Sequence, residues 1–448
     1  MNFEAFKQAV IAAANELGVA DYELYYQTAE STTVGAFGHE LKEFTSSVAG
    51  GVCLRCIVGG KMGYASTEAL DPEKAKALLL RAMDNAATIE TEDAVFLGEG
   101  GQEYEPLELK PYDLPATEEL IAAVLDTQEQ LYAADPHVVD GCETQGISEG
   151  SRFAIFNSRG LDLSYVNNTA GLITIAIVEK DGEKEDAFEV KLGKLDQIDI
   201  AAVTKKAAET ALGKIGGDVA DTGAYPVAFS PDAMCSLLSV FSSIFSSEAA
   251  AKGLSKLDGK EGEVIAAPIV TLVDDPFHPD SPMPINFDAE GSPAHRKNVI
   301  EGGRLNTLLY NLKSAARAGK QTTGNASKAG YDAPVGIRPF TMYLENGDLT
   351  EEELLARAGS GVYITSLDGL HAGANAISGD FSLQSAGFRI EDGRKTTRVK
   401  SFTVAGNFYD LLKNITAIAD NGKIPHPFGM TTFGSPTVLV EGLSIAGK

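Results

Sequence analysis

Apolar side chains at the start of the chain recur every three or four residues, the spacing of one face of an α-helix. Asn2 can cap this segment and Gly18 can end it, so the pattern predicts an amphipathic helix between them. Runs rich in β-branched residues follow, and a turn at 59–61 predicts a hairpin. The predicted strands cover residues 22–28, 32–37, 41–47, 51–58 and 62–65, and a second helix runs from Asp71 to about Ala87.

The same succession of a helix, several strands and a closing helix then occurs again. Residues 92–116 are acidic and rich in proline and glycine, which is typical of a linker. The turns at 158–160 and 181–182 separate predicted strands of the second set. This set comprises a helix over 117–134, strands over 141–148, 152–157, 161–167 and 171–179, and a helix over 199–214.

The rest of the chain has a different pattern. A glycine-rich link at 216–223 and a strand at 225–229 lead into a helix over 232–245. Beyond it, β-branched residues and turn signals dominate, and Asn346-Gly347 and Asp392-Gly393 are predicted hairpin turns. Only short helices interrupt these strands, near residues 305–319, 351–358 and 408–415.

These patterns predict an α+β fold in three parts, because 448 residues exceed the size at which one hydrophobic core stops growing. The predicted parts are a first module of helices packed on an antiparallel sheet (1–105), a second, central module of the same kind (106–222), and a β-rich C-terminal domain (223–448).

Charge and hydropathy narrow the classes of partner. The formal net charge of −26 disfavours binding to nucleic acid or to an anionic membrane surface. No apolar run approaches the about 20 residues that a membrane-spanning helix needs. The apolar run at 9–14 is also too short for a signal peptide, so we expect a cytoplasmic protein.

The four cysteines do not predict a metal or redox site. Cys53 and Cys56 form a C-x-x-C pair, but they lie on a predicted strand, where residues three apart point to opposite faces. No second such pair exists to complete a zinc site. We therefore expect structural thiols, and so few cysteines fit a reducing compartment.

Several short motifs occur in a fixed order along the C-terminal part. The motifs are Phe287–Pro293, Thr322–Ala326, Ser378–Phe381 with Gly387-Phe388, Phe402–Asn407 with Leu412–Asn414, and Phe433–Leu443. Through them the chain resembles the TldD/PmbA family of metallopeptidases, and specifically its TldE (PmbA) branch. The resemblance extends over essentially the whole chain, including 50–55 and 63–65 near the start.

The resemblance implies a fold, an assembly and an activity. TldD-like subunits carry a zinc-binding His-Glu-x-x-x-His motif, and a cysteine near the C-terminus is a further ligand. TldE-like subunits lack the motif, and the two kinds of subunit pair into a heterodimer that encloses a chamber for unfolded peptides. Members of the family are linked to trimming of a microcin precursor, to degradation of an antitoxin, and to an older description as modulators of DNA gyrase.

At the position of the zinc motif this chain carries Ser239 and Val240, with Ile244 in place of the second histidine. A zinc peptidase needs neutral imidazoles as ligands and a carboxylate to activate water, which these residues do not supply. The stretch 421–434, which corresponds to the region of the further ligand, contains no cysteine. The resemblance thus implies a subunit without catalytic residues or bound metal, with zinc expected only in a TldD-type partner.

The helix that contains these positions can be interpreted in two ways. Its apolar residues form a broad stripe at helical spacing, and the opposite face carries a run of serines. The serines can pack closely against a partner or a peptide, or one of them can act as a nucleophile. No G-x-S-x-G motif supports the nucleophile, so we favour the packing interpretation.

Three residues of the motifs and one histidine beside them are candidates for contact with a substrate or with the partner subunit. They are Asp288, Glu290, His295 and Asn325. For the first motif a purely structural interpretation stays open, in which Gly291 and Pro293 set a turn that Asp288 caps.

Two other functions stay open. The loop from Asp274 to Asp280, with His278 in it, either binds a cation or is a solvated loop. A cation there favours an active hydrolase with an unorthodox metal site. His39-Glu40 opens an H-E-x-x-H pattern that no second histidine completes. The second alternative is a peptide-binding regulatory module without an enzymatic partner. For the isolated chain we expect little peptidase activity, and a homodimer stays open.

Overall fold

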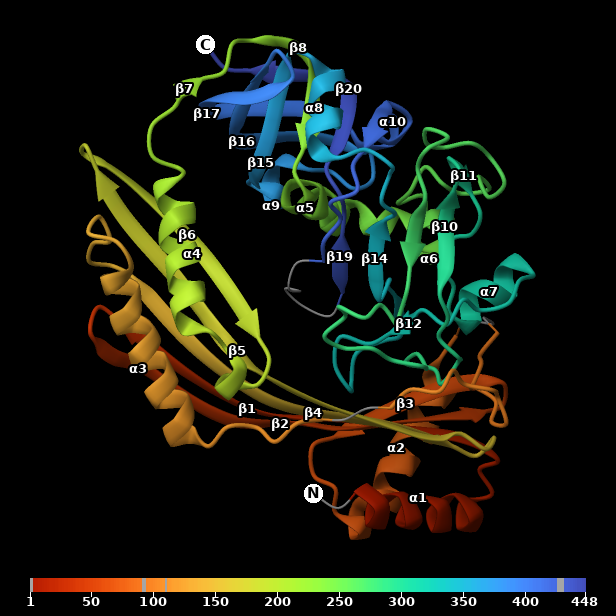
Figure 1. Ribbon diagram of the computed structural model, residues 1–448. Coiled ribbons are helices and arrows are strands. Elements are labelled where there is room, and N and C mark those ends of the chain that lie inside the picture. Colours follow the sequence, from red (N-terminus) through yellow and green to blue (C-terminus); the bar gives the residue numbers. More distant parts are fainter. Residues whose placement is uncertain (1–2, 91–93, 109–110, 425–430) are drawn as a thin grey trace. The chain divides into compact units, whose positions relative to one another are not determined.

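The computed structural model describes residues 3–90, 94–108, 111–424 and 431–448, and the chain forms two compact units (Figure 1). The first unit consists of Met1–Ile215 together with two short segments from later in the chain, Ala289–Gly291 and Lys328–Val335. The second unit consists of Gly216–Asp288, Ser292–Ser327 and Gly336–Lys448. Asn2, the predicted cap of the first helix, lies outside the described residues.

A six-stranded antiparallel sheet forms the body of the first unit, in the order β3-β2-β1-β4-β5-β6. The central strands β1 and β4 pair with each other from Glu23 opposite Asn157 to Phe37 opposite Glu143, so both predicted modules share one sheet. The strands are β1 Asp21–Phe37, β2 Glu40–Val58, β3 Lys61–Thr67, β4 Glu143–Asn157, β5 Asp162–Lys180 and β6 Glu183–Leu192.

These strands are longer than the sequence pattern predicts. The predicted pairs 22–28 with 32–37, and 41–47 with 51–58, are each one continuous strand, and the same holds for β4 and β5. Backbone pairing continues through the polar and glycine positions, for example Thr28 opposite Gly50, because the neighbouring strands supply hydrogen bonds there. β6 has no predicted counterpart because its sequence is mostly charged.

All four long helices of this unit cover the same face of the sheet. Leu24 packs with α1 and α2, and Val34 packs with α3. Because these two residues are an even number of positions apart on one strand, their side chains point to the same side. The helices are α1 Phe3–Leu17, α2 Ala75–Thr88, α3 Thr117–Ala134 and α4 Ile200–Leu212, each within a few residues of its prediction.

A closed ring of five strands, β20-β8-β15-β16-β17, forms a small barrel in the second unit, because β20 pairs with both β8 and β17. A second sheet follows the order β11-β10-β9-β14-β19. The barrel strands are β8 Gly223–Phe229, β15 Gly361–Asp368, β16 Asp380–Glu391, β17 Arg394–Asn407 and β20 Val438–Ala446, with β7 Asp218–Val219 and β18 Ile415–Ile418 at its margins.

The second sheet consists of β9 Leu272–Asp274, β10 Lys297–Glu301, β11 Arg304–Leu305, β14 Thr341–Leu344 and β19 Thr432–Gly434. A separate pair joins β12 Ala326–Ser327 and β13 Gly336–Ile337. The predicted α+β fold with a β-rich C-terminal region is confirmed.

The helices of the second unit are short, as the sequence predicts. They are α5 Pro231–Phe241, α6 Ser247–Ala251, α7 Leu312–Ala318, α8 Glu351–Ala358, α9 Leu370–Gly373 and α10 Phe408–Lys413. The helix predicted over 305–319 is shorter, since β11 takes its first residue and the Asn311 side chain caps the helix at Ser314. Within the described residues no helix combines the length and apolar character needed to cross a bilayer.

Of two hairpin turns predicted from Asn-Gly and Asp-Gly pairs, one forms and the other does not. Asp392 and Gly393, with φ angles of 50° and 73°, connect β16 to β17 in a tight hairpin, as predicted. The prediction at Asn346-Gly347 is wrong. Gly347 donates its N–H to Ala419 O, and the chain proceeds into α8 rather than turning back.

Candidate functional site

The helix α5 and the 3₁₀ turn that follows it carry the positions at which the zinc motif was expected. The Ser230 hydroxyl caps α5 by accepting the N–H of Ala233, and Pro231 occupies its first turn. The 3₁₀ turn, η3 Ser242–Phe245, continues the helix. The predicted apolar stripe is confirmed, because each of its members is 0% exposed: Met234, Leu237, Leu238, Phe241, Ile244 and Phe245.

The three motif positions have different environments, and none of them suits zinc. Ser239 is exposed, and its hydroxyl donates to Ser236 O at 2.8 Å. Val240 is half-buried, and Ile244 lies in the main apolar core of the unit. Aliphatic side chains have no lone pair for a metal, and a neutral serine is a poor zinc ligand. The residues present therefore do not fit a zinc ion.

The serines of this segment are held by neighbouring groups. Ser242 donates its hydroxyl to Ser239 O at 3.3 Å, one turn earlier. Ser247 is buried and donates to the Ser314 hydroxyl at 2.9 Å, which ties α6 to α7. Ser246 caps α6 by accepting the N–H of Ala249. This arrangement is typical of serines that pack and cap, in keeping with the packing interpretation.

Elements from several parts of the second unit surround α5. The helix contacts β8, β15, β19 and α9. Lys423 and Asp232 form an ion pair at 2.8 Å, so the described start of the stretch 421–434 lies against the first turn of α5. Residues 425–430 of that stretch lie outside the described residues. Helix α5 and the end of this stretch that forms β19 are therefore neighbours in this fold.

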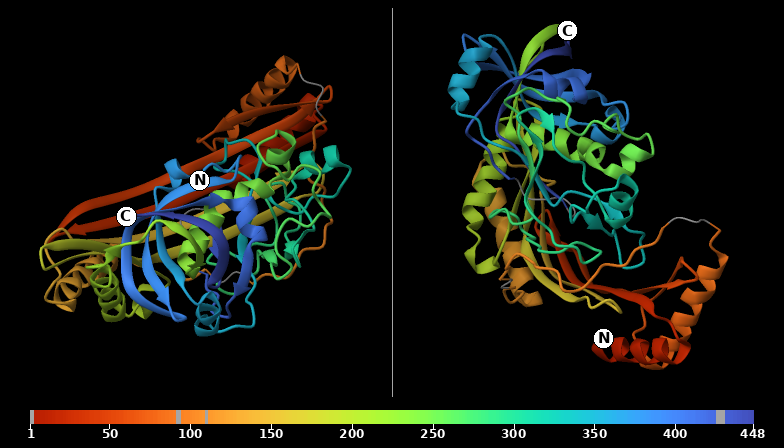
Figure 2. Two further views of the ribbon diagram at one scale, coloured as in Figure 1. Left: turned by 90° about the horizontal axis from the view of Figure 1, so that it is seen from above. Right: turned by 90° about the vertical axis from the view of Figure 1, so that its right-hand side faces the viewer.

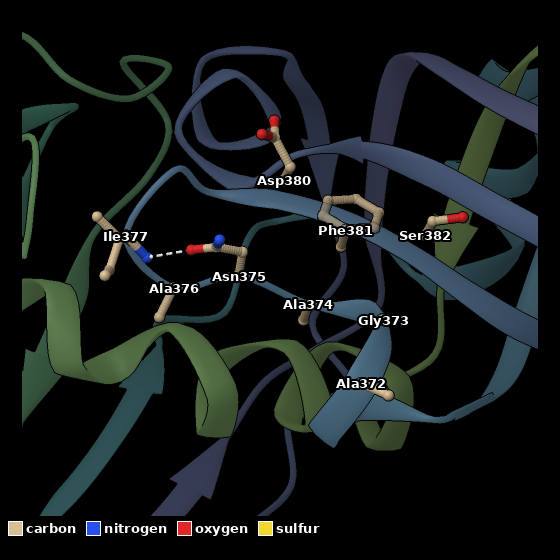
Figure 3. Close-up of a pocket in the computed structure, with 9 residues that line it drawn as sticks. All are labelled: Ala372, Gly373, Ala374, Asn375, Ala376, Ile377, Asp380, Phe381 and Ser382. Carbon is tan, nitrogen blue, oxygen red and sulfur yellow. Dashed lines mark hydrogen bonds between the residues drawn. The ribbon is translucent and has the colours of Figure 1, made fainter.

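A depression of about 540 Å³ lies next to α9 (Figure 3). The side-chain oxygen of Asn375 accepts the N–H of Ile377 at 2.9 Å, which shapes the loop. A hydrogen bond from Asn407 is the main cause of the lowered pKa of Asp380. Small residues dominate the lining: Ala372, Gly373, Ala374, Asn375, Ala376, Ile377, Asp380, Phe381 and Ser382. The motif Ser378–Phe381 thus contributes to a surface that offers backbone groups and little bulk.

A buried polar network joins β9, β10 and the segment before β12. The Lys297 ammonium lies 3.2 Å from Asp274 Oδ2 and donates to Asn325 Oδ1 at 3.1 Å. Asn325 donates to the same Asp274 oxygen at 2.7 Å, and the other oxygen accepts the N–H of Phe340. All three side chains are buried, so the charge of Asp274 is balanced inside the protein.

Asp288 stabilises a turn. Its carboxylate accepts the N–H groups of Ser292 and Ala326, each at 2.9 Å, and Gly291 has a φ of 75°. This geometry matches the interpretation in which Asp288 caps a turn at Gly291. The second contact also joins the motif at 287–293 to the one at 322–326, so the structure brings Asp288 next to the Asn325 network.

Glu290 lies in the first unit and is 4% exposed. There Glu23 and Arg55 form a buried ion pair with a nitrogen–oxygen distance of 2.7 Å. Burial lowers the pKa of Arg55, but the carboxylates of Glu23 and Glu290 outweigh it and hold this pKa above its ordinary value. Glu290 therefore contributes negative charge to a buried cluster, and its contact with a substrate or partner stays a prediction.

His295 reaches the surface beside the Lys297 network. Partial desolvation and the positive charge of Lys297 lower the pKa of this histidine, so the imidazole is neutral near pH 7. The structure thus places three of the four candidates, Asp288, His295 and Asn325, around one region of the second unit. Their role toward a substrate or partner stays a prediction.

The loop that begins at Asp274 offers few free ligands. Asp274 is occupied by the network, and Asp275 accepts the N–H of Phe277. The His278 ring lies edge-on to Tyr343, and its Nδ1 accepts the N–H of Asp280. Across the described ranges there is no group of three or more His, Cys, Asp or Glu side chains that could hold a metal ion.

All four cysteines are buried and free, as structural thiols are expected to be. Burial raises the pKa of Cys56 to about 11 and that of Cys235, on α5, to about 12. Such thiols stay protonated at neutral pH and are poor nucleophiles and poor metal ligands.

Three family models match the chain in succession. Residues 22–86 match the PmbA/TldA metallopeptidase domain 1, residues 110–215 match the central domain, and residues 222–447 match the C-terminal domain. Together they cover most of the sequence, in the order that the family has.

Individual relatives agree with these matches. A metalloprotease of Methanothermobacter thermautotrophicus is 27% identical over 86% of this chain and 85% of its own length. The crystal structure of a proposed modulator of a DNA gyrase from Thermotoga maritima has a TM-score of 0.89 and 31% identity, covering 99% of this chain and all 100% of that one. TldE from Thermococcus kodakarensis has a TM-score of 0.87 at 24% identity, with 99% and 100% covered, which shows the fold alone.

Proposed function

Because the chain belongs to the PmbA/TldD metallopeptidase family, we propose that it is the PmbA/TldE-type subunit of a peptidase complex and is itself non-catalytic. In this proposal a TldD-type partner with the His-Glu-x-x-x-His motif supplies the zinc and the glutamate that activates water. The substrates are unfolded peptides, and this chain forms part of the wall that binds them.

The environment of Ile244 carries the proposal. The second imidazole of the motif would have to replace a side chain that is 0% exposed and packed in the main core of the unit. A zinc ligand must reach the metal together with a substrate-accessible water. A side chain buried in the core cannot reach both a metal and such a water. We therefore assign a packing role to this segment.

The surroundings of α5 support a role in peptide binding. The small residues around the depression at 372–382 leave room for an extended chain and expose backbone groups. Backbone hydrogen bonds give affinity with little dependence on sequence, which suits a peptidase of broad specificity. The exposed Ser239 of α5 and the exposed Ser243 of η3 offer further small polar groups nearby.

The test measures zinc content and cleavage of an unstructured peptide for the purified full-length chain, alone and mixed with its His-Glu-x-x-x-His homologue. We expect a metal-free, inactive chain that raises the peptidase activity of the mixture above that of the homologue alone. As a matched control, the homologue with glutamine in place of its motif glutamate should give an inactive mixture. Stoichiometric zinc with chelator-sensitive cleavage by the single chain would overturn the proposal.

A further inference from the structure

The loop between α9 and β16 lines much of the depression shown in Figure 3, and its own hydrogen bonds hold its shape. Asn375 donates its N–H to Asp380 O, and Gly379 donates to Asn375 O, each at 2.8 Å. The side-chain oxygen of Asn375 accepts the N–H groups of Ile377 and Ser378. The strand β16, which follows the loop, is one of the blue strands beside the label C in both views of Figure 2. A loop fixed in this way can bind a ligand without first becoming ordered.

Asp380 is the one charged residue in the lining of the depression. Its side chain is exposed, and hydrogen bonds from Asn407 and Ser378 lower its pKa, so the carboxylate is ionised at neutral pH. The nearby Lys256 ammonium donates instead to Ser378 O at 2.6 Å and lies over the Tyr409 ring. In the part of the chain that the structure describes, Asp380 forms no ion pair. The depression therefore contains a negative charge that no side chain of the protein neutralises by direct contact.

Apolar groups make up most of the rest of the lining. Ile377 is 48% exposed, and Ala372, Ala374, Ala376 and Phe381 lie around the same depression. A long aliphatic side chain that ends in a cation matches this combination. Its methylene groups can cover apolar surface while its charged end stays beside a carboxylate and water. Lysine and arginine are the residues with such side chains.

We propose that the depression is a subsite for a basic side chain of an unfolded peptide, and that Asp380 sets this preference. The inference rests on the peptide-binding part of the proposed function and names the class of peptide that this chain selects. The net charge of −26 attracts cationic peptides to the whole molecule. The Asp380 carboxylate restricts that preference to one position of the bound peptide, because a direct ion pair requires the cation to lie beside it.

Fluorescence anisotropy of the full-length chain with labelled, unstructured peptides tests the inference. Three peptides of equal length differ only at the central residue, which is lysine, norleucine or glutamate. We expect the lysine peptide to bind about three- to fivefold more tightly than the norleucine peptide, as for an exposed ion pair, and the glutamate peptide to bind most weakly. Raising the salt concentration to about 0.5 M should reduce the preference for lysine, because salt screens an exposed pair.

A pair of variants assigns the preference to Asp380. Asp380→Asn removes the charge but keeps a side-chain oxygen for the hydrogen bond from Asn407, so the loop should keep its shape. It should abolish the preference for lysine over norleucine and leave the affinity for the norleucine peptide unchanged. Asp348→Asn removes the same charge at an exposed position outside the lining and should preserve the preference. Equal affinities of the unsubstituted chain for the lysine and norleucine peptides, or two variants with equal effects, would overturn the inference.

The outcomes also separate this inference from the proposed function. If the chain raises the peptidase activity of the His-Glu-x-x-x-His homologue but shows no preference for lysine, the function survives and the subsite fails. If the preference depends on Asp380 but the mixture with the homologue stays inactive, the subsite survives and the subunit role fails. A chain that binds none of the three peptides would overturn the subsite, whatever the activity of the mixture.

Discussion

Ile244 stands where the zinc motif would have its second histidine, and a substitution there measures how far the position depends on apolar packing. Ile244→His should destabilise the protein by about 3 kcal/mol, because it removes apolar burial and places an imidazole without a designed partner in the core. Ser239→His, at an exposed position of the preceding helix α5, should change the free energy of unfolding by less than about 0.5 kcal/mol. Urea unfolding measures both. Equal, small effects would mean that position 244 tolerates a polar ligand.

Removing one partner of the buried Asp274–Lys297 ion pair should strongly lower the stability of the protein. Lys297→Met leaves a buried carboxylate uncompensated and should cost about 3–5 kcal/mol of stability. Adding Asp274→Asn removes that charge and should recover part of the loss. Lys206→Met, which breaks an exposed pair with Glu189, should cost no more than about 1 kcal/mol. If the double variant is as unstable as the sum of the single ones, the two residues are not coupled.

Sequence patterns found the apolar side of α5 but missed this network, for a physical reason. Between Met234 and Phe245 an apolar residue recurs about once per helical turn, so a short stretch of sequence is enough to predict that these side chains share one buried face. Asn325 lies 51 positions from Asp274, and only the folded sheet brings them together. The one local signal was Lys297 next to the apolar residues of β10, where a charge requires a buried partner.

Helix α8 packs on the barrel through Leu354 and Leu355, and the Glu351 carboxylate adds a pH-sensitive attachment. Glu351 accepts hydrogen bonds from Tyr363, Thr437, Asn421 and Lys395. Burial raises the pKa of Glu351, but the bonds from Lys395, Thr437 and Tyr363 outweigh it and hold the pKa below 4.5. The unfolded chain therefore binds this proton first as pH falls, and the stabilisation is lost through the folded pKa.

Glu351→Gln should cost about 1–3 kcal/mol near pH 7, where the carboxylate is charged in both states. The difference from the unsubstituted chain should shrink as pH falls below 4.5, because the glutamine does not titrate. Unfolding curves between pH 3 and 7 measure this. Glu352→Gln, at an exposed neighbour, is the matched control and should differ little throughout. A gap that stays constant with pH would show that the charge of Glu351 is not what holds α8.

The ends of strands could be predicted where the chain makes a tight turn. They could not be predicted where one long strand runs on through polar residues. Gly59 and Gly60 adopt positive φ between β2 and β3, and glycine there is a local, legible signal. By contrast, Glu30 and Ser31 fall in the gap between two predicted strands, yet they pair with β2. Register is decided by the partner strand, so a single sequence cannot show that two predicted strands are one.

The net charge of the whole chain bears on whether this protein binds DNA. A relative described as a proposed modulator of a DNA gyrase suggests a test for DNA contact. This chain has 63 acidic residues against 37 Lys and Arg, a net charge of −26 and a pI of about 4.6. Binding to DNA depends on cations that displace counterions from the phosphates, and an acidic surface repels the duplex.

We therefore expect no binding of a labelled DNA duplex by the full-length chain at 0.15 M salt, with a dissociation constant weaker than about 10⁻⁴ M. Fluorescence anisotropy measures this, with a basic DNA-binding protein as the positive control. Lowering the salt should not rescue binding, because the long-range repulsion then grows. Tight binding that weakens steeply with salt would require a cationic patch strong enough to overcome the net charge, and would bring a nucleic-acid function back into consideration for this chain.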